Sequence, residues 1–446
     1  MINYTPAGHL SSVTDAEGAT ESYAYDGAGN LAAKTDRNGN TTSYTYDSLN
    51  RVSSMVDGEN GVTLYEYDEV RNVTAVIRPN EGVIRYQYDA LDRATSMTDA
   101  EGYRTTYVYD KDGLLLSETD PRGGVTKHEY DDEGKRTKTT SPMGFVTLYS
   151  YDALGRLVAT VDANQGESKA TYDANGRLTS VTTPLGLTTG YEYDEMGRLT
   201  KETQQDGTIL KYEYDEKGNL VKETDANGGV TVYTYDANDR LTSKTDPEGD
   251  VTKYSYNANH WITSAEDGEG YVTEYQYDAN GNIVSVTDGR GNSTRFTYDG
   301  LDRLTMVVDA ENGVTTYTYD EIGNATAVST PNDATVSAAY DKNGQKVSET
   351  DGEGYTTVYT YDGNGNLTSK TDPREGTTTY TYDGVGMTAT VTNYTRDGKG
   401  RITAIQDAHG NYRYLEYDPM DRIVADTDEN GVRRTYAYDA RGNLIQ

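Results

Sequence analysis

Residues 25–46 read YDGAGNLAAKTDRNGNTTSYTY, and the two turn signals in this stretch decide the fold. The first signal, Asp26-Gly-Ala-Gly29, and the second, Asp36-Arg-Asn-Gly39, stand ten residues apart. An aspartate that opens a turn accepts hydrogen bonds from backbone amides two or three residues later, and glycine supplies the positive φ that closes the turn. Short segments between such turns predict a succession of antiparallel hairpins.

Tyrosine supplies almost all of the aromatic surface. The 446 residues include 42 Tyr, two Phe and one Trp. A tyrosine buries a large ring while its hydroxyl stays wet or hydrogen-bonded, so it can pack a polar chain. Tyr44 and Tyr46 stand at alternate positions, so both rings leave the strand on one face. This composition favours a folded all-β chain over a disordered one, despite a net charge of −33.

The hairpin is a repeat of 21 residues. From position 25 to position 382 the repeat tyrosine recurs in 17 equal steps without insertion, and Asp follows it everywhere except at Tyr256, where Asn257 follows. Beyond Tyr382 the next slot, Arg396-Asp397, comes seven residues early, and the regular step then resumes. The repeat tyrosines are Tyr25, Tyr46, Tyr67, Tyr88, Tyr109, Tyr130, Tyr151, Tyr172, Tyr193, Tyr214, Tyr235, Tyr256, Tyr277, Tyr298, Tyr319, Tyr340, Tyr361, Tyr382, Tyr417 and Tyr438.

The repeat predicts one spiralling antiparallel β-hairpin array, either a β-solenoid or a hollow shell, over residues 1–446. It contains about 22 units, of which the unit at 382–396 is shortened. A twisted sheet of this many strands tends to curl. Closure into a shell and extension as a filament both stay open. Solenoids generally carry distinct capping repeats, and none is visible, so we expect a segment of a larger protein or ends that other chains cover.

Arginine or asparagine follows the first turn of most units and precedes an aliphatic residue, as in Arg156-Leu157 and Arg198-Leu199. We expect the guanidinium plane to lie over a neighbouring tyrosine ring. Whether the leucine shares the tyrosine face depends on a β-bulge at the turn, because one extra residue reverses the register. The sequence leaves that choice open.

Two stretches carry a family resemblance, YSYDALGRL at 149–157 and YEYDEMGRL at 191–199. They resemble the YD repeat of Rhs proteins, of bacterial wall-associated proteins, of the B and C subunits of insecticidal toxin complexes, and of teneurins. The resemblance implies a shell that encloses a C-terminal toxin, or, as in teneurins, an adhesion module. Asp120 and Asp246 open DPxG-like sequences in ordinary second-turn slots, so we interpret them as turns rather than self-cleavage motifs. The structural-repeat residues that we single out are Tyr25, Asp26, Tyr46, Asp47, Tyr151, Asp152, Arg156, Tyr193, Asp194 and Arg198.

No catalytic, cofactor or metal site is predicted. The chain has no cysteine, and its four histidines fall at unrelated offsets in the repeat. Carboxylates recur at every turn, whereas a catalytic pair would occur once in the chain, so we do not interpret them as catalytic. We expect them to stabilise the turns, and weak calcium binding is the alternative. The tyrosine rows favour cross-strand packing over a sugar-binding platform. Two irregular places are the best candidates for something specific: Asn257 with Asn259-His260-Trp261, and the shortened unit at Tyr382–Arg396.

These observations predict a non-enzymatic structural shell of a secreted or surface Rhs-like protein, with a bacterial source expected. Its partners would be a toxin or other domains of the same polypeptide. The alternative is a cell-surface adhesion or carbohydrate-binding module that binds surface glycans. The acidic charge argues against nucleic acid, and no apolar run is long enough to insert in a membrane. The first residues lack the features of a signal peptide. Cargo and oligomeric state stay open.

Overall fold

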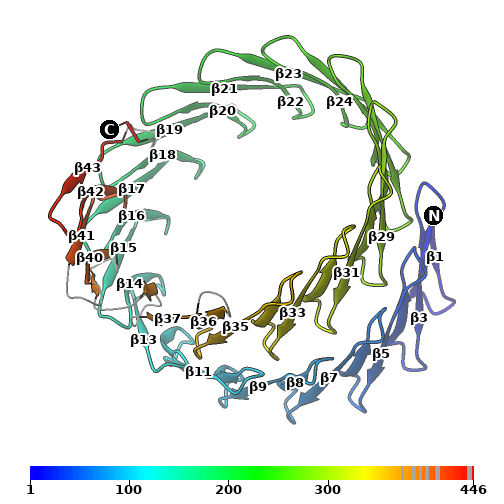
Figure 1. The fold of residues 1–446 in the computed structure, drawn as a ribbon, viewed down its shortest axis with the longest axis horizontal. Coiled ribbons are helices and arrows are strands. Elements are labelled where there is room, and N and C mark those ends of the chain that lie inside the picture. The colour runs from blue at the N-terminus through cyan, green and yellow to red at the C-terminus, as the bar shows by residue number, and fades with distance from the viewer. Residues whose placement is uncertain are drawn as a thin grey trace. The chain divides into compact units, whose positions relative to one another are not determined.

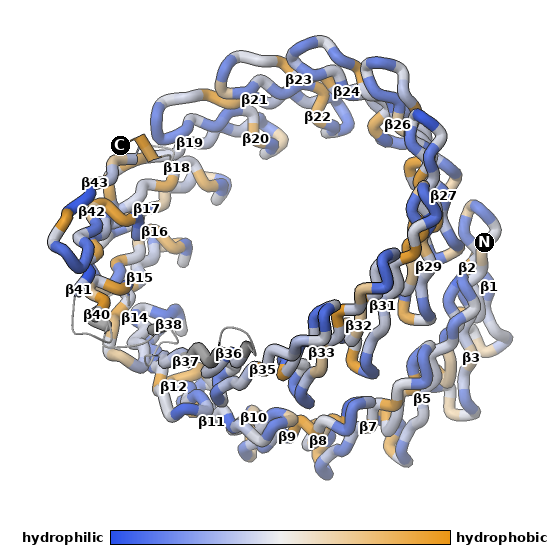
Figure 2. Tube along the Cα trace, in the orientation of Figure 1, coloured by the Kyte–Doolittle hydropathy of each residue, from blue (hydrophilic) through white to orange (hydrophobic). Residues whose placement is uncertain are grey.

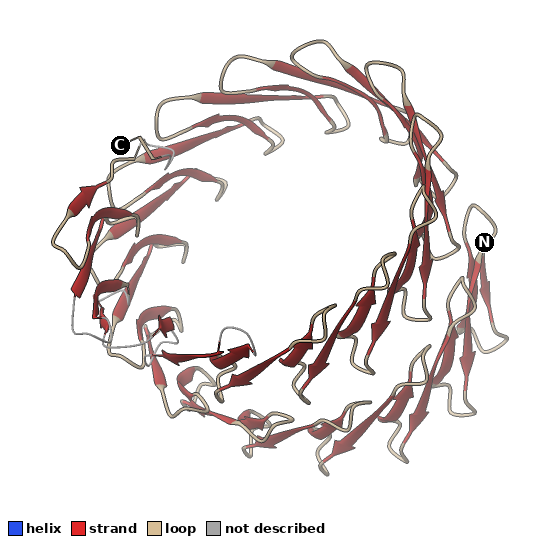
Figure 3. Cartoon of the chain, viewed as in Figure 1, coloured by secondary structure: helices blue, strands red, loops and turns tan. Residues whose placement is uncertain are grey.

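The computed structural model describes residues 1–372, 376–382, 388–390, 394–396, 401–406, 412–438 and 444–445. Within this part of the chain every regular element is a β-strand and none is a helix (Figure 3). Strands β1–β38 belong to one sheet and β39–β43 to another. The predicted all-β fold of antiparallel hairpins is confirmed. None of the described segments is a helix of the length and apolar character that crossing a bilayer requires.

Long and short strands alternate. Eighteen six-residue strands each end at a repeat tyrosine: β3 (Thr20–Tyr25), β5 (Thr41–Tyr46), β7 (Val62–Tyr67), β9 (Val83–Tyr88), β11 (Arg104–Tyr109), β13 (Val125–Tyr130), β15 (Val146–Tyr151), β17 (Glu167–Tyr172), β19 (Thr188–Tyr193), β21 (Ile209–Tyr214), β23 (Val230–Tyr235), β25 (Val251–Tyr256), β27 (Val272–Tyr277), β29 (Ser293–Tyr298), β31 (Val314–Tyr319), β33 (Thr335–Tyr340), β35 (Thr356–Tyr361) and β41 (Tyr412–Tyr417).

The five-residue strands follow the first turn of each unit: β2 (Leu10–Thr14), β4 (Leu31–Thr35), β6 (Val52–Val56), β8 (Val73–Ile77), β10 (Ala94–Thr98), β12 (Leu115–Thr119), β14 (Arg136–Thr140), β16 (Leu157–Val161), β18 (Leu178–Thr182), β20 (Leu199–Thr203), β22 (Leu220–Thr224), β24 (Leu241–Thr245), β26 (Ile262–Glu266), β28 (Ile283–Thr287), β30 (Leu304–Val308), β32 (Ala325–Ser329), β34 (Lys346–Thr350), β40 (Ile402–Gln406) and β42 (Ile423–Thr427). The others are β1 (Ile2–Tyr4), β36 (Leu367–Asp372), β37 (Gly376–Tyr382), β38 (Thr388–Thr390), β39 (Tyr394–Arg396) and β43 (Arg433–Thr435). The shortened unit at 382–396 lies largely outside the described residues.

The register at the first turn answers the question that the sequence left open. Tyr25 pairs with Leu31 across the turn. The next pair is Ala24 with Ala33, so Ala32 has no partner and forms a bulge. The same shift recurs in the other hairpins of this type. Directly paired residues share a face of a sheet, so the leucine lies beside the repeat tyrosine.

The chain forms two compact units. The first unit contains residues 1–104, 233–360 and 370–377, and the second contains 105–232, 361–369 and 378–446. In the first unit two stretches of hairpin ribbon lie side by side, one around β3–β9 (blue) and one around β29–β33 (yellow-green) (Figure 1). The turns at the facing edges of these two stretches are in contact.

The sheet has almost no dry interior. Among the described residues, only Ala75, Ala404 and Ala425 are fully buried apolar side chains. Along the backbone, hydrophilic residues predominate and apolar residues form short, interrupted segments (Figure 2). The strand ladders and the contacts between half-buried side chains therefore hold the fold together, rather than a hydrophobic core.

Candidate functional site

In most units the repeat tyrosine ties its strand to the preceding five-residue strand. The tyrosine hydroxyl donates to the backbone carbonyl fifteen residues earlier, at 2.8–2.9 Å in four examples: Tyr25 to Leu10, Tyr46 to Leu31, Tyr151 to Arg136 and Tyr193 to Leu178. Burial raises the pKa of Tyr46 above the ordinary tyrosine value. The Tyr46 hydroxyl is therefore a structural hydrogen-bond donor at neutral pH.

The aspartate that follows each repeat tyrosine closes the first turn. In the unit of Asp152, Oδ1 accepts the backbone amides of Leu154 and Arg156, at 2.9 and 3.0 Å. The other oxygen, Oδ2, accepts Nε of Arg156 at 2.7 Å. The hydrogen bonds from the Arg156 side chain and backbone lower the pKa of Asp152. Asp26, Asp47 and Asp194 accept hydrogen bonds in the same way.

The arginine links its own unit to the next one. The guanidinium carbon of Arg156 lies 4.8 Å from the ring centroid of Tyr172, and Nη1 donates to the Asp173 carbonyl at 3.0 Å. Arg198 repeats the arrangement over Tyr214, at 4.9 Å. The expected contact between arginine and a neighbouring tyrosine is thus present. Consecutive units are joined into a ladder of carboxylate, guanidinium and phenol, in which each of these groups is engaged.

A seam of turn-to-turn hydrogen bonds joins the two ribbons of the first unit. Asn280, at the third position of a first turn, donates from Nδ2 to Oδ2 of Asp36 at 2.9 Å. Its Oδ1 accepts the backbone amide of Asn38 at 3.2 Å. Partial burial acts to raise the pKa of Asp36, but the hydrogen bonds from Asn280 and Asn40 outweigh it and lower the pKa.

The seam contact recurs in register. The same Asn Nδ2 to Asp Oδ2 bond joins residues 244 apart in sequence, at 2.7–3.0 Å, in Asn259–Asp15 and Asn343–Asp99 of the first unit and in Asn364–Asp120 of the second. Carboxylates of the second turn also accept backbone amides of the facing first turn, as Glu17 does from Ala258 and Glu101 from Lys342. With a 21-residue repeat, this separation is about eleven and a half units, so in these contacts a first turn faces a second turn.

Two glycines let the ribbons approach most closely. A Cβ built on Gly58 would lie 2.4 Å from the carbonyl oxygen of Gly300, and one on Gly300 would lie 2.8 Å from that of Gly58. Any larger residue would force the turns apart. Sequence reasoning missed the seam, although it has a signal: asparagine occupies the third turn position in YNAN, YDAN, YDKN and YDGN, at residues 259, 280, 343 and 364.

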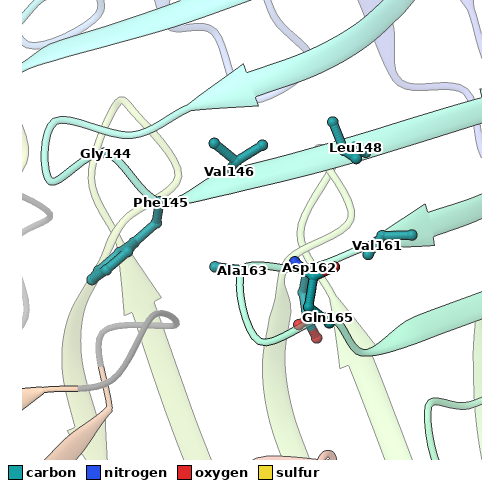
Figure 4. A pocket seen from close by; sticks show the side chains of 8 residues that line it. All are labelled: Gly144, Phe145, Val146, Leu148, Val161, Asp162, Ala163 and Gln165. Carbon is teal, nitrogen blue, oxygen red and sulfur yellow. The ribbon is translucent and has the colours of Figure 1, made fainter.

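The second unit contains a cavity of about 230 Å³ beside β15 and β16 (Figure 4). Phe145, Val146, Leu148 and Val161 give it apolar walls. Its one carboxylate, Asp162, accepts the amides of its own turn through Oδ1. The cavity therefore holds no pair of groups suited to acid–base or nucleophilic chemistry.

The histidines and carboxylates do not assemble a metal site in the described part of the chain, where no three metal-ligating side chains gather. The His9 ring packs at a tilt against Tyr25, with 4.7 Å between the ring centroids, and Nδ1 of His128 lies 3.2 Å from the Thr139 hydroxyl. His260 sits in a turn with a φ of 66°. His409 falls outside the described residues.

Comparison with models of known protein families identifies the repeat. The model described as RHS Repeat matches more than half of the chain, at residues 4–41, 172–209, 214–251, 235–272, 256–293, 277–313, 340–376, 361–393 and 417–446. The chain belongs to the RHS-repeat family. A second model, Teneurin YD-shell, matches residues 37–168 of this RHS-repeat chain. Among curated proteins, none matches the sequence.

Solved structures share the fold of this RHS-repeat chain. The TcdB2–TccC3 complex matches all of it with a TM-score of 0.78 and 16% identity, and the TcdB2–TccC3–Cdc42 complex does so with 0.77 and 16%. A Photorhabdus luminescens Tc holotoxin pore matches 98% of it with a TM-score of 0.71 and 15% identity. In each case the RHS-repeat chain spans 30% of the length of the matched chain.

Proposed function

We propose that residues 1–446 form one wall array of a toxin-encapsulating shell in a secreted bacterial assembly, with no enzymatic activity of its own. The seam carries this proposal. Ribbons whose turns join through Asn–Asp bonds and facing glycines make a wall of larger area than a single ribbon does. The likeness in fold to the TcdB2–TccC3 complex supports the same role.

The use of the repeated polar groups supports the absence of activity. Each carboxylate of the ladder accepts turn amides, each arginine bridges to the next unit, and each phenol described above donates to a carbonyl. Groups engaged in this way are not available as nucleophiles or proton carriers. The partner we propose is a toxin domain of the same polypeptide or assembly, held by enclosure rather than by a specific site.

The alternative, surface adhesion through tyrosine rows, has less support. In an ordinary unit the arginine of the preceding unit lies over the tyrosine ring, and the tyrosine hydroxyl is hydrogen-bonded, as for Tyr172. Little ring surface is left for a ligand. We therefore do not propose that the tyrosine rows bind carbohydrate.

Protease protection of an attached cargo tests the proposal. A destabilised reporter enzyme would be fused after Gln446, and the same reporter fused before Met1 would serve as the matched control. We expect the fusion after Gln446 to survive a protease dose that digests the free reporter, and to be digested once the wall is denatured. Equal digestion of the fused and the free reporter would contradict enclosure.

A further inference from the structure

One repeat of the array departs from the ladder at two positions together. In the preceding repeat Asp236 accepts Nε of Arg240 at 2.7 Å, and the guanidinium carbon of Arg240 lies 5.0 Å from the ring centroid of Tyr256. One repeat later the same two positions hold Asn257 and Trp261, the single tryptophan of the chain. Both the anion and the cation of the ladder are therefore replaced by neutral side chains.

The indole takes the place of the guanidinium without disturbing the turn. Its ring centroid lies 5.2 Å from that of Tyr277, at an interplanar angle of 44°. Oδ1 of Asn257 accepts the Trp261 amide at 2.9 Å, as the aspartate of an ordinary repeat does. The chain thus supplies a second aromatic ring beside Tyr277 at the position from which an arginine elsewhere covers the tyrosine.

A cavity of about 450 Å³ opens beside this repeat, within the first compact unit of the chain. Trp261, Tyr275 and Tyr277 line it from one ribbon together with Asp278, and Glu17 lines it from the facing ribbon at the seam. Cavities that bind small molecules have this size. None of the described residues that line the cavity is basic. Aromatic rings and carboxylates therefore surround a space to which the lining contributes no cation.

We propose that this cavity, which we call the Trp261 cavity, binds the quaternary ammonium group of a small soluble cation such as choline. The face of an aromatic ring attracts a cation, and indole does so most strongly. The methyl groups of a quaternary ammonium spread its charge and pack against aromatic rings. The carboxylates of Glu17 and Asp278 add attraction over a longer range.

The hydrogen bonds of the two carboxylates favour a cation without N–H groups. Oδ1 of Asp278 accepts the backbone amide of Asn280 at 3.0 Å, and Oδ2 accepts the side-chain amide of Asn38 at 3.0 Å. Oε1 of Glu17 accepts the Ala258 amide at 2.7 Å. A primary ammonium or a guanidinium has N–H donors that need acceptors of their own. A quaternary ammonium has no such donors and needs only charge and aromatic contact.

The same carboxylates discriminate among molecules that contain a quaternary ammonium. Phosphocholine and the headgroup of phosphatidylcholine carry a phosphate close to the ammonium. Glu17, Asp278 and the net charge of −33 repel that phosphate. We therefore expect free choline to bind, rather than a lipid surface.

The emission of Trp261 makes the test site-specific, because the chain has no other tryptophan. It would be followed at constant ionic strength while choline, its neutral isostere 3,3-dimethylbutanol, methylammonium, phosphocholine or phosphatidylcholine vesicles are added. We expect choline to saturate with a dissociation constant on the order of 1 mM, and the other four probes to bind at least tenfold more weakly. Raising the salt from about 20 to about 500 mM should weaken choline binding several-fold, because salt screens the carboxylates.

Single substitutions separate the contributions of ring, hydroxyl and charge. Tyr275→Phe keeps the ring and should bind choline as the original chain does, whereas Tyr275→Leu should bind it several-fold more weakly. Glu17→Gln keeps an oxygen for the Ala258 amide and should weaken choline binding and reduce its salt dependence. Equal binding by Tyr275→Leu and Tyr275→Phe would contradict a role for the ring.

The matched control restores the ordinary repeat. Asn257→Asp combined with Trp261→Arg places a guanidinium beside Tyr277 and is expected to keep the melting temperature. Saturation-transfer NMR of the choline methyl groups, which needs no tryptophan, should show no signal with this variant. The proposal is overturned if choline does not saturate the emission change by ~100 mM, if any of the other four probes binds as tightly as choline, or if the restored variant binds choline as well as the original chain.

Discussion

Replacing Tyr193 with Phe removes one hydroxyl and nothing else from the ladder. That hydroxyl donates to the Leu178 carbonyl at 2.8 Å, from a half-buried ring. A neutral hydrogen bond contributes about 1 kcal/mol net, so the local opening equilibrium should rise about fivefold. The equivalent hydroxyls of Tyr172 and Tyr214 lie two strands away on either side, roughly 10 Å. At that distance effects add, so the triple variant should lose about 3 kcal/mol.

Hydrogen exchange measured by mass spectrometry is the suitable assay, because long repeat arrays lose two-state behaviour and open locally. The amides of β18–β20 should exchange faster in the variant and those of distant strands should not. Tyr271→Phe is the matched control: Tyr271 is 49% exposed, and no hydrogen bond to its hydroxyl is present among the described residues. If Tyr193→Phe changes exchange no more than Tyr271→Phe does, the phenols do not hold the strands together.

Three further outcomes are expected. Burial raises the pKa of Tyr67 and of other repeat tyrosines, such as Tyr46 and Tyr88. The stabilisation that these phenols provide is therefore complete below the ordinary tyrosine pKa of about 10 and is lost as the pH rises through the higher pKa of the folded chain. The melting temperature from circular dichroism should be constant from neutral pH to about 9 and fall steeply above about 10, where the absorbance of tyrosinate rises. Asn280→Ala should speed exchange several-fold in both turns of its seam contact, whereas Asn175→Ala, in the same slot on an exposed turn, should not; equal effects would refute the seam. Arg198→Lys keeps the charge but loses the planar contact with the next ring and the bond to the next turn, so β20 and β21 should open several-fold more often, and Arg290→Lys on an exposed turn should leave them unchanged.

Local features of the fold followed from the sequence, because each unit carries its own signals. Asp26 and Gly29 define the first turn and Asp36 and Gly39 the second, and the structure has both where the spacing predicts them. The contact of arginine with tyrosine could also be predicted from the sequence, because an arginine recurs at the position of Arg156, at a fixed offset from the tyrosine that it covers.

Two features were not accessible in this way. The bulge at Ala32 depends on how the two strands align, which the hydrophobic pattern of so polar a chain does not fix. The seam depends on how far the sheet curves before Asn280 reaches Asp36, and curvature accumulates from small twists that no residue encodes alone. The cavity at Trp261 combines both cases: the irregular unit was visible in the sequence, whereas the facing Glu17 was not.

The scarcity of fully buried side chains has a thermal consequence. The heat capacity increment of unfolding comes mainly from apolar surface newly exposed to water, while newly exposed polar surface reduces it. A chain whose fully buried apolar side chains, in the part described, are three alanines exposes little of the former and much of the latter. Its free energy of unfolding should therefore vary unusually gently with temperature, so that cooling weakens the wall less than it weakens a globular protein of the same length.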